Sequence, residues 1–403
     1  MKLANFEAGT REVPWTLALC FLAALTEGFD IQSMGVAAPG LASALALSHD
    51  QLGPAFSASL LGLLIGSLIL GRMADRMGRK WTLIASMLIF GVFSAATVLA
   101  WDTGSLITIR GLAGLGLGGA LPNLVALAAE AAAPSRRARM VTLIASGLPF
   151  GSAVSAAVAL LGWKAVFLVG GAAPLMLAPL MARALPESRR FLQAREDRGG
   201  TKASQESIPR ILFGGSRLAT TVLLWSGLFA ALLTLHLMLN WLPTLMISKG
   251  VSKDAASLVS LLFNLGGGAG VLVVSALLAR GRRAWTLGGL YAGMALSLIA
   301  LASVNADLAA TAIAGFAAGT FISVGPIALY GLAPDYYAVA MRGTGVGTAM
   351  AAGRLGAVLG PLLAAPLLNI GAGSSGVLLA LTPLVAVGGG ATLLLLRRPT
   401  VAD

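Results

Sequence analysis

Cysteine, histidine and charged residues are all scarce in this sequence. The chain has one cysteine, Cys20, and two histidines, His49 and His236. A lone thiol cannot form an internal disulfide or a dithiol redox pair, and so few Cys and His residues cannot build a Cys/His metal cluster. The HExxH, GxSxG and P-loop motifs of zinc proteases, serine hydrolases and nucleotide hydrolases are also missing from the sequence. We therefore expect no enzymatic activity, no metal and no organic cofactor.

The low charge content predicts a membrane protein. Only 11% of the residues are charged and 57% are hydrophobic, whereas about 25% of the residues of a soluble globular protein are charged. About 20 apolar residues in a helix cross the hydrocarbon core of a bilayer. The sequence contains twelve such runs, at residues 15–37, 51–71, 81–100, 104–128, 139–161, 163–182, 217–239, 253–278, 284–304, 308–332, 344–369 and 374–396. The predicted fold class is an all-α membrane protein with twelve transmembrane helices.

The basic residues predict how the chain is oriented. The net charge is +12, which by itself could indicate nucleic-acid binding. Lysine and arginine, however, gather in alternate loops, and the loops of the other side carry only Lys164, Lys249 and Lys253. By the positive-inside rule, both termini are expected in the cytoplasm. The positive charge is therefore a topology signal, and we expect no nucleic-acid partner.

A long polar stretch after the sixth run predicts two halves. Residues 186–210 read PESRRFLQAREDRGGTKASQESIPR, and they separate two sets of about six helices. This layout is typical of secondary transporters built from parallel repeats. We expect an N-terminal bundle at 1–185, a cytoplasmic linker at 186–215 and a C-terminal bundle at 216–403. A regulatory role of the linker is a less favoured alternative to a plain charged connection.

Two acids interrupt the first apolar run. Glu27 and Asp30 lie at i and i+3, so both face one side of a helix. A charge in the middle of a bilayer costs about 2.5–3.5 kcal/mol on insertion scales. The pair therefore predicts a side of this helix that faces water or cations inside the protein, and not lipid.

The fourth run contains a buried-charge candidate and a glycine pattern. Arg110 lies about two turns into the run, so it requires an anionic partner unless it extends to the membrane surface. Gly114, Gly116 and Gly119 fit GxGxxG, but no strand precedes them, which argues against a dinucleotide site. Small residues at Gly114 and Gly118 instead predict the close approach of a second helix.

The loop between the second and third runs carries a specific motif. It reads GRMADRMGRK at residues 71–80, with Arg72, Asp75, Arg76 and Arg79 in a tight basic turn. This pattern matches GxxxDRxGRK, the loop motif of the major facilitator superfamily. The corresponding stretch of the second half, SALLARGRRAW, has Ala279 where an acid would be expected. The resemblance implies that Asp75 and its arginines form a conformational latch; a positive-inside turn without a gating role is the alternative.

Further stretches narrow the resemblance. They are EGFDIQ in the first run, the Arg110 segment, Glu130 at the end of the fourth run, PES at 186–188, NWLP, and MRGTGVGTAMAAGRLGAVLGP at 341–361. Together they resemble the aromatic acid:proton symporter family, and within it the branch of bacterial 3-(3-hydroxyphenyl)propionate transporters. One departure is Glu27, where many members have Asp, although this branch also has EG there. The resemblance covers about residues 15–396.

The resemblance implies a fold, a function and site residues. The fold would be the major facilitator fold, with two pseudo-symmetric six-helix bundles in a bacterial inner membrane. The chain would be a monomeric symporter that imports a small aromatic acid together with protons. Asp30 would be the main proton-coupling residue with Glu27 assisting, and the gating residues would be Asp75, Arg72, Arg76, Arg79, Glu130 and Arg342.

Arg354 is the predicted ligand of the substrate carboxylate. It lies near the middle of an apolar run, where a guanidinium is costly, and its planar fork can bind a carboxylate with two hydrogen bonds. A permanent ion pair with Glu27 or Asp30 is the alternative. Other candidates for substrate binding are Arg110, His236, Asn240 and Asn264, although hydrogen bonds between helices would explain the last three equally well.

Three other functions are weaker. An efflux antiporter would share the loop motif but would prefer neutral or cationic substrates, which intramembrane arginines disfavour. A symporter for a non-aromatic organic acid also remains an alternative. A receptor would be expected to carry a soluble output domain, for which the sequence has no candidate segment.

Overall fold

The computed structural model describes residues 12–131, 140, 143–188, 191–192, 212–214, 217–279, 281–305 and 307–400. Within these ranges the regular elements are all helical. Twelve stretches are long and apolar enough to cross a membrane, as predicted from the hydropathy of the sequence. Short 3-10 turns extend three of the helices, at Thr97–Leu99, Ala159–Leu161 and Ala333–Tyr336.

The chain forms two compact units. Among the described residues, unit 1 takes those within Met1–Leu45 and Ala58–Thr201, and unit 2 those within Ala46–Ser57 and Lys202–Asp403. The helices of unit 1 are α1 (Glu12–Leu45), most of α2 (His49–Met77), α3 (Arg79–Ala96), α4 (Thr103–Ala131), α6 (Gly147–Val158) and α7 (Trp163–Ala184). Those of unit 2 are α10 (Arg217–Ser248), α11 (Lys253–Ala279), α12 (Arg283–Ser303), α13 (Leu308–Ile322), α14 (Val324–Leu332), α15 (Val339–Asn369) and α16 (Gly373–Leu395).

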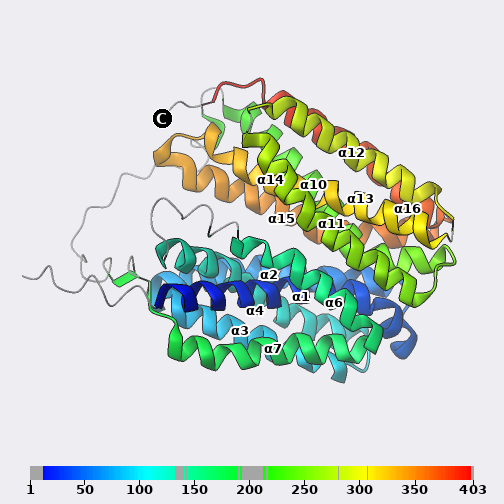
Figure 1. Cartoon of the computed structure of the whole chain (residues 1–403), viewed down its shortest axis with the longest axis horizontal. Coiled ribbons are helices and arrows are strands. Elements are labelled where there is room, and N and C mark those ends of the chain that lie inside the picture. Colours follow the sequence, from blue (N-terminus) through cyan, green and yellow to red (C-terminus); the bar gives the residue numbers. More distant parts are fainter. Residues whose placement is uncertain are drawn as a thin grey trace, which may run out of the picture. The chain divides into compact units, whose positions relative to one another are not determined.

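The same order of helix contacts occurs in both units. In unit 1, α1 packs on α6 and α7, while α3 packs on α4 and α7. In unit 2, α10 packs on α15 and α16, while α12 packs on α13 and α16. Figure 1 shows the helices of each unit running side by side as a bundle. The units are thus pseudo-symmetric six-helix bundles, with α13 and α14 together forming one span.

The first turns of α2 group with unit 2 and not with the bundle that holds the rest of the helix. Side-chain contacts explain this assignment. The ring of Phe56 packs edge-on against Trp241 of α10, with centroids 5.3 Å apart. The Ser57 hydroxyl donates to the carbonyl oxygen of Val358 in α15 at 2.7 Å. The predicted linker at 186–215 lies mostly outside the described residues, so this boundary stays a prediction.

Glycines let the helices of unit 1 approach closely, as predicted for Gly114 and Gly118. A Cβ atom on Gly114 would lie 2.0 Å from the carbonyl oxygen of Ser59 in α2, and one on Gly118 2.3 Å from that of Leu63. Real Cβ atoms do not come this close to backbone atoms, so these positions admit only glycine at this helix separation. The neighbour of α4 in this packing is therefore α2.

The equivalent pair of helices in unit 2 packs in the same way. A Cβ on Gly266 of α11 would lie 2.2 Å from the carbonyl oxygen of Phe316 in α13, and one on Gly319 1.8 Å from that of Phe263. Backbone contact without side chains between the helices thus occurs at the same place in both repeats. This spacing fixes the two pairs of helices more tightly than apolar side chains could, because lipid competes for apolar side chains but not for backbone contact.

Two helices are longer than predicted. We expected the first span to end near residue 37 and the seventh near residue 239, yet α1 continues to Leu45 and α10 to Ser248. Each extension passes a proline, Pro39 in α1 and Pro243 in α10. Proline often ends a helix in water, but inside a membrane protein neighbouring helices satisfy the backbone groups that it frees. The longer α10 places His236 and Asn240 well inside the helix.

Loop residues cap several helix ends outside the membrane. Asp102 precedes α4, and its carboxylate accepts a hydrogen bond from the backbone N–H of Ser105 at 2.7 Å. The hydrogen bonds from Ser105 lower the pKa of the Asp102 carboxyl. Asp307 caps α13 in the same way through the N–H of Ala310. These acids satisfy N–H groups that have no partner in the first turn of a helix.

Candidate functional site

A buried ion pair between Asp30 and Arg110 forms the centre of the candidate site in unit 1. Two guanidinium nitrogens of Arg110 donate to the two carboxylate oxygens of Asp30, at 3.1 Å and 2.8 Å. Both side chains are almost completely inaccessible, with exposed fractions of 0% for Asp30 and 1% for Arg110. The expected anionic partner of Arg110 is thus Asp30. The alternative that Arg110 extends to the membrane surface is wrong.

Three further helices hold this pair in position. The hydroxyl of Ser94 in α3 donates to Asp30 at 2.6 Å. The Nε of Arg110 donates to the hydroxyl of Ser59 in α2 at 3.0 Å. The guanidinium also lies over the ring of Phe167 in α7, with its carbon 5.4 Å from the ring centroid. The two charges are therefore fixed by α1, α2, α3, α4 and α7 together.

The geometry of this ion pair stabilises two opposite charges inside unit 1. A bidentate pair with added hydrogen bonds offsets much of the desolvation cost of two buried charges. Removal of one partner leaves the other charge uncompensated, at a cost of about 3–5 kcal/mol. The two charges therefore depend on each other for compensation inside unit 1.

Glu27 lies one turn before Asp30 on α1 and is also buried, with 2% of its surface exposed. The next residue, Gly28, lies where α1 packs closely on α6. Its carbonyl oxygen accepts a hydrogen bond from Ser152 of α6 at 2.8 Å. A Cβ on Gly28 would lie 2.0 Å from the carbonyl oxygen of Leu148. Both acids of the first span are thus buried inside the protein, as expected from their shared helix face.

Arg354, the predicted substrate ligand, lies in unit 2 on α15. Its side chain is partly exposed, and it is close enough to Tyr330 of α14 for an electrostatic interaction with the phenol. A nearby glycine allows α15 to approach α10 closely, since a Cβ on Gly356 would lie 2.3 Å from the carbonyl oxygen of Phe229. A guanidinium and a phenol on such a rigid support can both donate hydrogen bonds to an anion.

His236, Asn240 and Asn264 make the same kind of local contact. His236 and Asn240 lie on α10 and Asn264 on α11. Each uses one side-chain nitrogen to bond the carbonyl oxygen one turn earlier in its own helix, at 3.0, 2.8 and 2.8 Å. Substrate contact by these residues stays a prediction.

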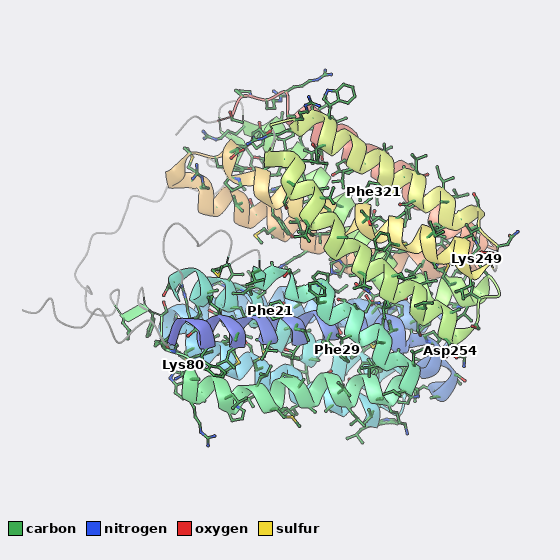
Figure 2. All side chains as sticks on the ribbon, in the orientation of Figure 1. Phe21, Phe29, Lys80, Lys249, Asp254 and Phe321 are labelled. Carbon is green, nitrogen blue, oxygen red and sulfur yellow. The ribbon has the colours of Figure 1, made fainter. Side chains whose placement is uncertain are left out.

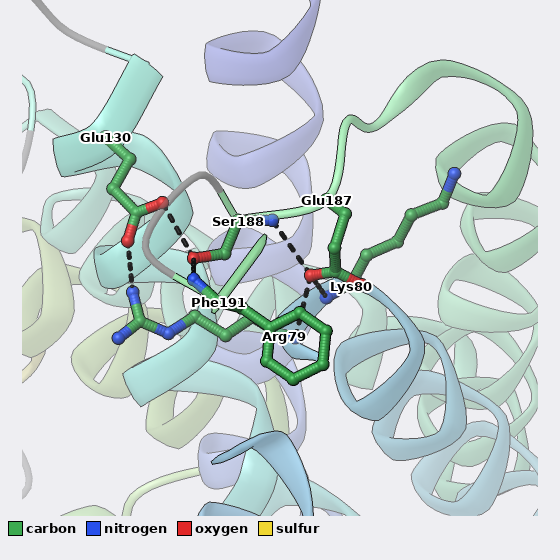
Figure 3. Close-up of polar contacts among 6 residues, drawn as sticks. All are labelled: Arg79, Lys80, Glu130, Glu187, Ser188 and Phe191. Carbon is green, nitrogen blue, oxygen red and sulfur yellow. Dashed lines mark hydrogen bonds and ion pairs between the residues drawn. The ribbon is translucent and has the colours of Figure 1, made fainter. Parts of the chain in front are cut away.

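Two of the predicted gating residues meet at one end of unit 1. The guanidinium of Arg79 forms an ion pair with Glu130 at the end of α4. The other oxygen of Glu130 accepts a hydrogen bond from the Ser188 hydroxyl at 2.8 Å. Beside this pair, one oxygen of Glu187 accepts hydrogen bonds from the backbone N–H groups of Arg79, Lys80 and Ser188. Figure 3 shows this cluster, which we call the α3 cap: Arg79, Lys80, Glu130, Glu187 and Ser188.

Three other gating candidates, Arg72, Arg76 and Arg342, have side chains that the structure describes. Arg72 donates weakly to the carbonyl oxygen of Leu68 in its own helix, at 3.4 Å, and Arg76 is exposed. Arg342 lies in unit 2, where its Nε donates to the carbonyl oxygen of Tyr337 at 3.4 Å. Burial raises the pKa of the Tyr337 phenol, which pairs with the hydroxyl of Thr221. The side chain of Asp75 lies outside the described residues.

Several partners of the predicted residues could not be identified from the sequence. Ser59, Ser94 and Phe167 hold the buried ion pair, yet each is an ordinary residue of an apolar run. Glu187 belongs to the PES stretch, which the resemblance includes without a role for the acid. Tyr330 is one of four tyrosines in the chain, and this scarcity is a signal that could have drawn attention to it.

Comparisons with known proteins agree with this architecture. A model of the Major Facilitator Superfamily matches residues 20–252. The chain is 44% identical to the 3-(3-hydroxy-phenyl)propionate transporter of Escherichia coli strain K12, over 95% of this chain and 94% of that protein. It is 34% identical to a gallate transporter of Pseudomonas putida, over 89% and 86%. It is 33% identical to a 4-hydroxybenzoate transporter of Pseudomonas aeruginosa, over 94% and 92%.

Solved structures show the same fold at low identity. The D-xylose-proton symporter superimposes with a TM-score of 0.73 at 19% identity, over 94% of this chain and 96% of that chain. The nucleoside transporter NupG superimposes with a TM-score of 0.77 at 13% identity, over 96% and 100%.

Proposed function

The chain belongs to the major facilitator superfamily, and from this premise we propose that it is a proton-coupled symporter that imports a small aromatic carboxylate by alternating access. As a multi-pass membrane protein of this superfamily with bacterial relatives, it would lie in a bacterial inner membrane with both termini in the cytoplasm. Relatives named for hydroxyphenylpropionate, gallate and 4-hydroxybenzoate transport support the substrate class. We further propose that it acts as a monomer without a cofactor.

The observation that carries the coupling proposal is the buried pair of Asp30 and Arg110. In this proposal Asp30 is the main proton carrier and Glu27, one turn away, assists it. Protonation of Asp30 releases the guanidinium of Arg110 from its counterion, and loss of the proton restores the pair. Because the pair is held by five helices of unit 1, its formation and loss can change how these helices pack.

Substrate recognition is assigned to unit 2 in the same proposal. Arg354 binds the carboxylate through its fork, with the phenol of Tyr330 beside it. His236, Asn240 and Asn264 line the remainder of the site, and Arg110 is the next candidate for the carboxylate. The gating residues are Asp75, Arg72, Arg76, Arg79, Glu130 and Arg342, of which Arg79 and Glu130 form an ion pair.

Uptake by purified protein in liposomes tests this function. Radiolabelled 3-(3-hydroxyphenyl)propionate, 4-hydroxybenzoate and gallate would be offered with and without an inward proton gradient, and an uncoupler would serve as control. We expect accumulation above the external concentration only with the gradient. Accumulation that ignores the gradient would refute proton coupling, and a gradient that drives the acids in the opposite direction would indicate the antiporter.

A further inference from the structure

Two polar side chains lie one turn apart in the middle of α10, a helix of otherwise mainly apolar residues. They are His236, which is partly exposed, and Asn240, which is 3% exposed. Their i, i+4 spacing places them on one face of the helix, with Cβ atoms about 6 Å apart. Polar residues at this depth are costly, and they normally mark an interior path or a binding site.

The backbone contact of His236 determines which hydrogen bonds its ring can offer. Its Nδ1 lies 3.0 Å from the carbonyl oxygen of Leu232. A carbonyl oxygen only accepts, so Nδ1 must carry the proton. A charged ring costs free energy inside an apolar span, which favours the neutral imidazole. In this tautomer Nε2 has no proton and presents a lone pair, so the free side of the ring is a hydrogen-bond acceptor.

The contact of Asn240 fixes the orientation of its amide by the same reasoning. Its nitrogen lies 2.8 Å from the carbonyl oxygen of His236. Only the NH2 group can donate there, so the amide oxygen points elsewhere as an acceptor, and one N–H remains as a donor. The two side chains together thus offer two acceptors and one donor.

A hydroxyl group matches this set, and a carboxylate does not. A hydroxyl can donate its proton to Nε2 of His236 and accept from the N–H of Asn240. A carboxylate only accepts, so it could bond the N–H of Asn240 but its negative charge would face the lone pairs of Nε2 and of the amide oxygen. Arg354 has the opposite character, because a guanidinium only donates. The acid end and the hydroxyl end of an aromatic hydroxy acid therefore match side chains of different character.

We infer that His236 and Asn240 recognise a hydroxyl group on the ring of the transported acid, and that His236 Nε2 is the acceptor that distinguishes hydroxylated from unsubstituted rings. This inference rests on the proposed function, because it requires that the chain binds aromatic acids. It adds a specificity-determining contact within the same site. A pocket that bonds a hydroxyl discriminates strongly against analogues without it, since the buried polar group is then left unpaired.

Three ligands with one carbon skeleton test the inference on the full-length protein. They are 3-(3-hydroxyphenyl)propionate, 3-phenylpropionate, which lacks the hydroxyl, and 3-(3-methoxyphenyl)propionate, which keeps an acceptor oxygen but has no proton to donate. Affinity would be measured by titration calorimetry in detergent. For the wild type we expect the hydroxylated acid to bind at least about tenfold more tightly than either analogue.

Variants of both histidines complete the experiment. His236→Phe should reduce the preference to within about threefold, by weakening binding of the hydroxylated acid only. His236→Gln supplies an amide oxygen and should keep part of the preference. His49→Gln is the matched control, because His49 is exposed at the first turn of α2, and it should keep the full preference.

The outcomes separate this inference from the proposed function. Equal binding of the three acids by the wild type would overturn the inference and leave aromatic acid transport intact. A folded His236→Phe variant with the full preference would overturn it as well. If His236→Phe does not fold, two measurements still test the inference. They are the affinity of the wild type for the hydroxylated acid relative to the methoxy analogue, and the same ratio for His236→Gln. Absence of binding to all three acids would instead contradict the proposed function.

Discussion

At the scale of single residues, the loss of Asp30 and the loss of Arg110 have different consequences. Asp30 can lose its charge by taking up a proton, whereas a guanidinium stays protonated under all conditions in a protein. Replacement of Asp30 by Asn imitates the protonated acid permanently. Replacement of Arg110 removes the group that responds to it. Under the proposed function, the acid is therefore the position at which coupling can be separated from binding.

The first prediction concerns coupling. Asp30→Asn should abolish accumulation driven by the proton gradient and spare exchange of substrate across the membrane, because exchange requires no net proton movement. Counterflow and gradient-driven uptake in the same liposomes measure the two processes. Ser94→Ala is the control, because it removes one hydrogen bond to the same carboxylate and keeps the acid. Accumulation that persists in both Asp30→Asn and Glu27→Gln would exclude these acids as proton carriers.

The second prediction concerns the carboxylate of the substrate. Arg354→Lys keeps the charge and loses the planar fork, so it should weaken binding of the acid at least about thirtyfold, which corresponds to about 2 kcal/mol. Calorimetry with the acid and with its uncharged amide measures this, after thermal unfolding has shown that the variant is folded. Unchanged affinity of a folded variant, or equal binding of acid and amide by the wild type, would mean that another residue binds the carboxylate. Arg110 would then be tested next.

At the scale of helices, the glycine contacts connect packing to the ion pair. Gly114 lies one turn after Arg110 on α4, and its missing side chain allows contact with the carbonyl oxygen of Ser59. The hydroxyl of the same serine accepts from Arg110. Separation of α2 from α4 would therefore move Ser59 away from the guanidinium that it helps to hold.

The third prediction follows from this connection. Gly114→Ala should destabilise the protein by about 1–3 kcal/mol, since a Cβ atom 2.0 Å from a backbone oxygen forces the helices apart. It should also impair proton-driven uptake. Gly289→Ala on α12 is the control, because a Cβ there also meets no atom within 4 Å. Thermal unfolding and proton-driven uptake would be measured for both variants. Equal stability and equal uptake of the two would show that the close approach of α2 and α4 is not required.

The fourth prediction concerns the first turn of α3. The carboxylate of Glu187 accepts from two N–H groups at this helix start, where negative charge is stabilising. Glu187→Gln keeps an oxygen and loses the charge, so it should cost about 1 kcal/mol. Glu187→Ala loses both and should cost more. Thermal unfolding of the purified proteins is expected to rank wild type above Gln and Gln above Ala, and an Ala variant as stable as wild type would contradict a capping role.

The number of helices could be predicted from the sequence, but their ends and their contacts could not. Hydropathy predicted all twelve spans, because each helix must be apolar over the thickness of the bilayer on its own. The ends of α1 and α10 were missed, since Pro39 and Pro243 end helices only where no neighbour satisfies the freed backbone. Arg110 required an acid, but the choice of Asp30 depends on how α1 packs against α4. That packing is a property of the bundle and not of either helix sequence.

At the scale of the whole molecule, one repeated architecture carries different charged residues in its two units. Glycine contacts between α2 and α4 recur between α11 and α13. The charged groups do not recur, because the buried acid and its arginine belong to unit 1 and Arg354 belongs to unit 2. Figure 2 shows the side chains of each bundle. Phe21 and Phe29 lie along α1, and Lys249 and Asp254 lie at the connection between α10 and α11. In the proposed function, this divergence of charges gives one bundle for the proton and one for the substrate.

Orientation in the membrane gives the fifth prediction, which applies to the whole chain. The lone cysteine, Cys20, is 0% exposed, so the wild type should not react with a maleimide that cannot cross membranes. This provides a background for single cysteines at Lys164 and Arg398, both of which are exposed. Lys164 follows the start of α7 on the side that is poor in basic residues, and Arg398 follows α16 on the basic side.

The positive-inside rule requires opposite results for these two positions. In intact cells, Lys164→Cys should be labelled and Arg398→Cys should be labelled only after the membrane is permeabilised. Seven spans separate the two positions, from α7 through α16, with α13 and α14 counted as one. An odd number of crossings places Lys164 and Arg398 on opposite faces if every span crosses. Labelling of both positions in intact cells would mean that one span does not cross the bilayer. Labelling of Arg398→Cys alone would show that the orientation is inverted.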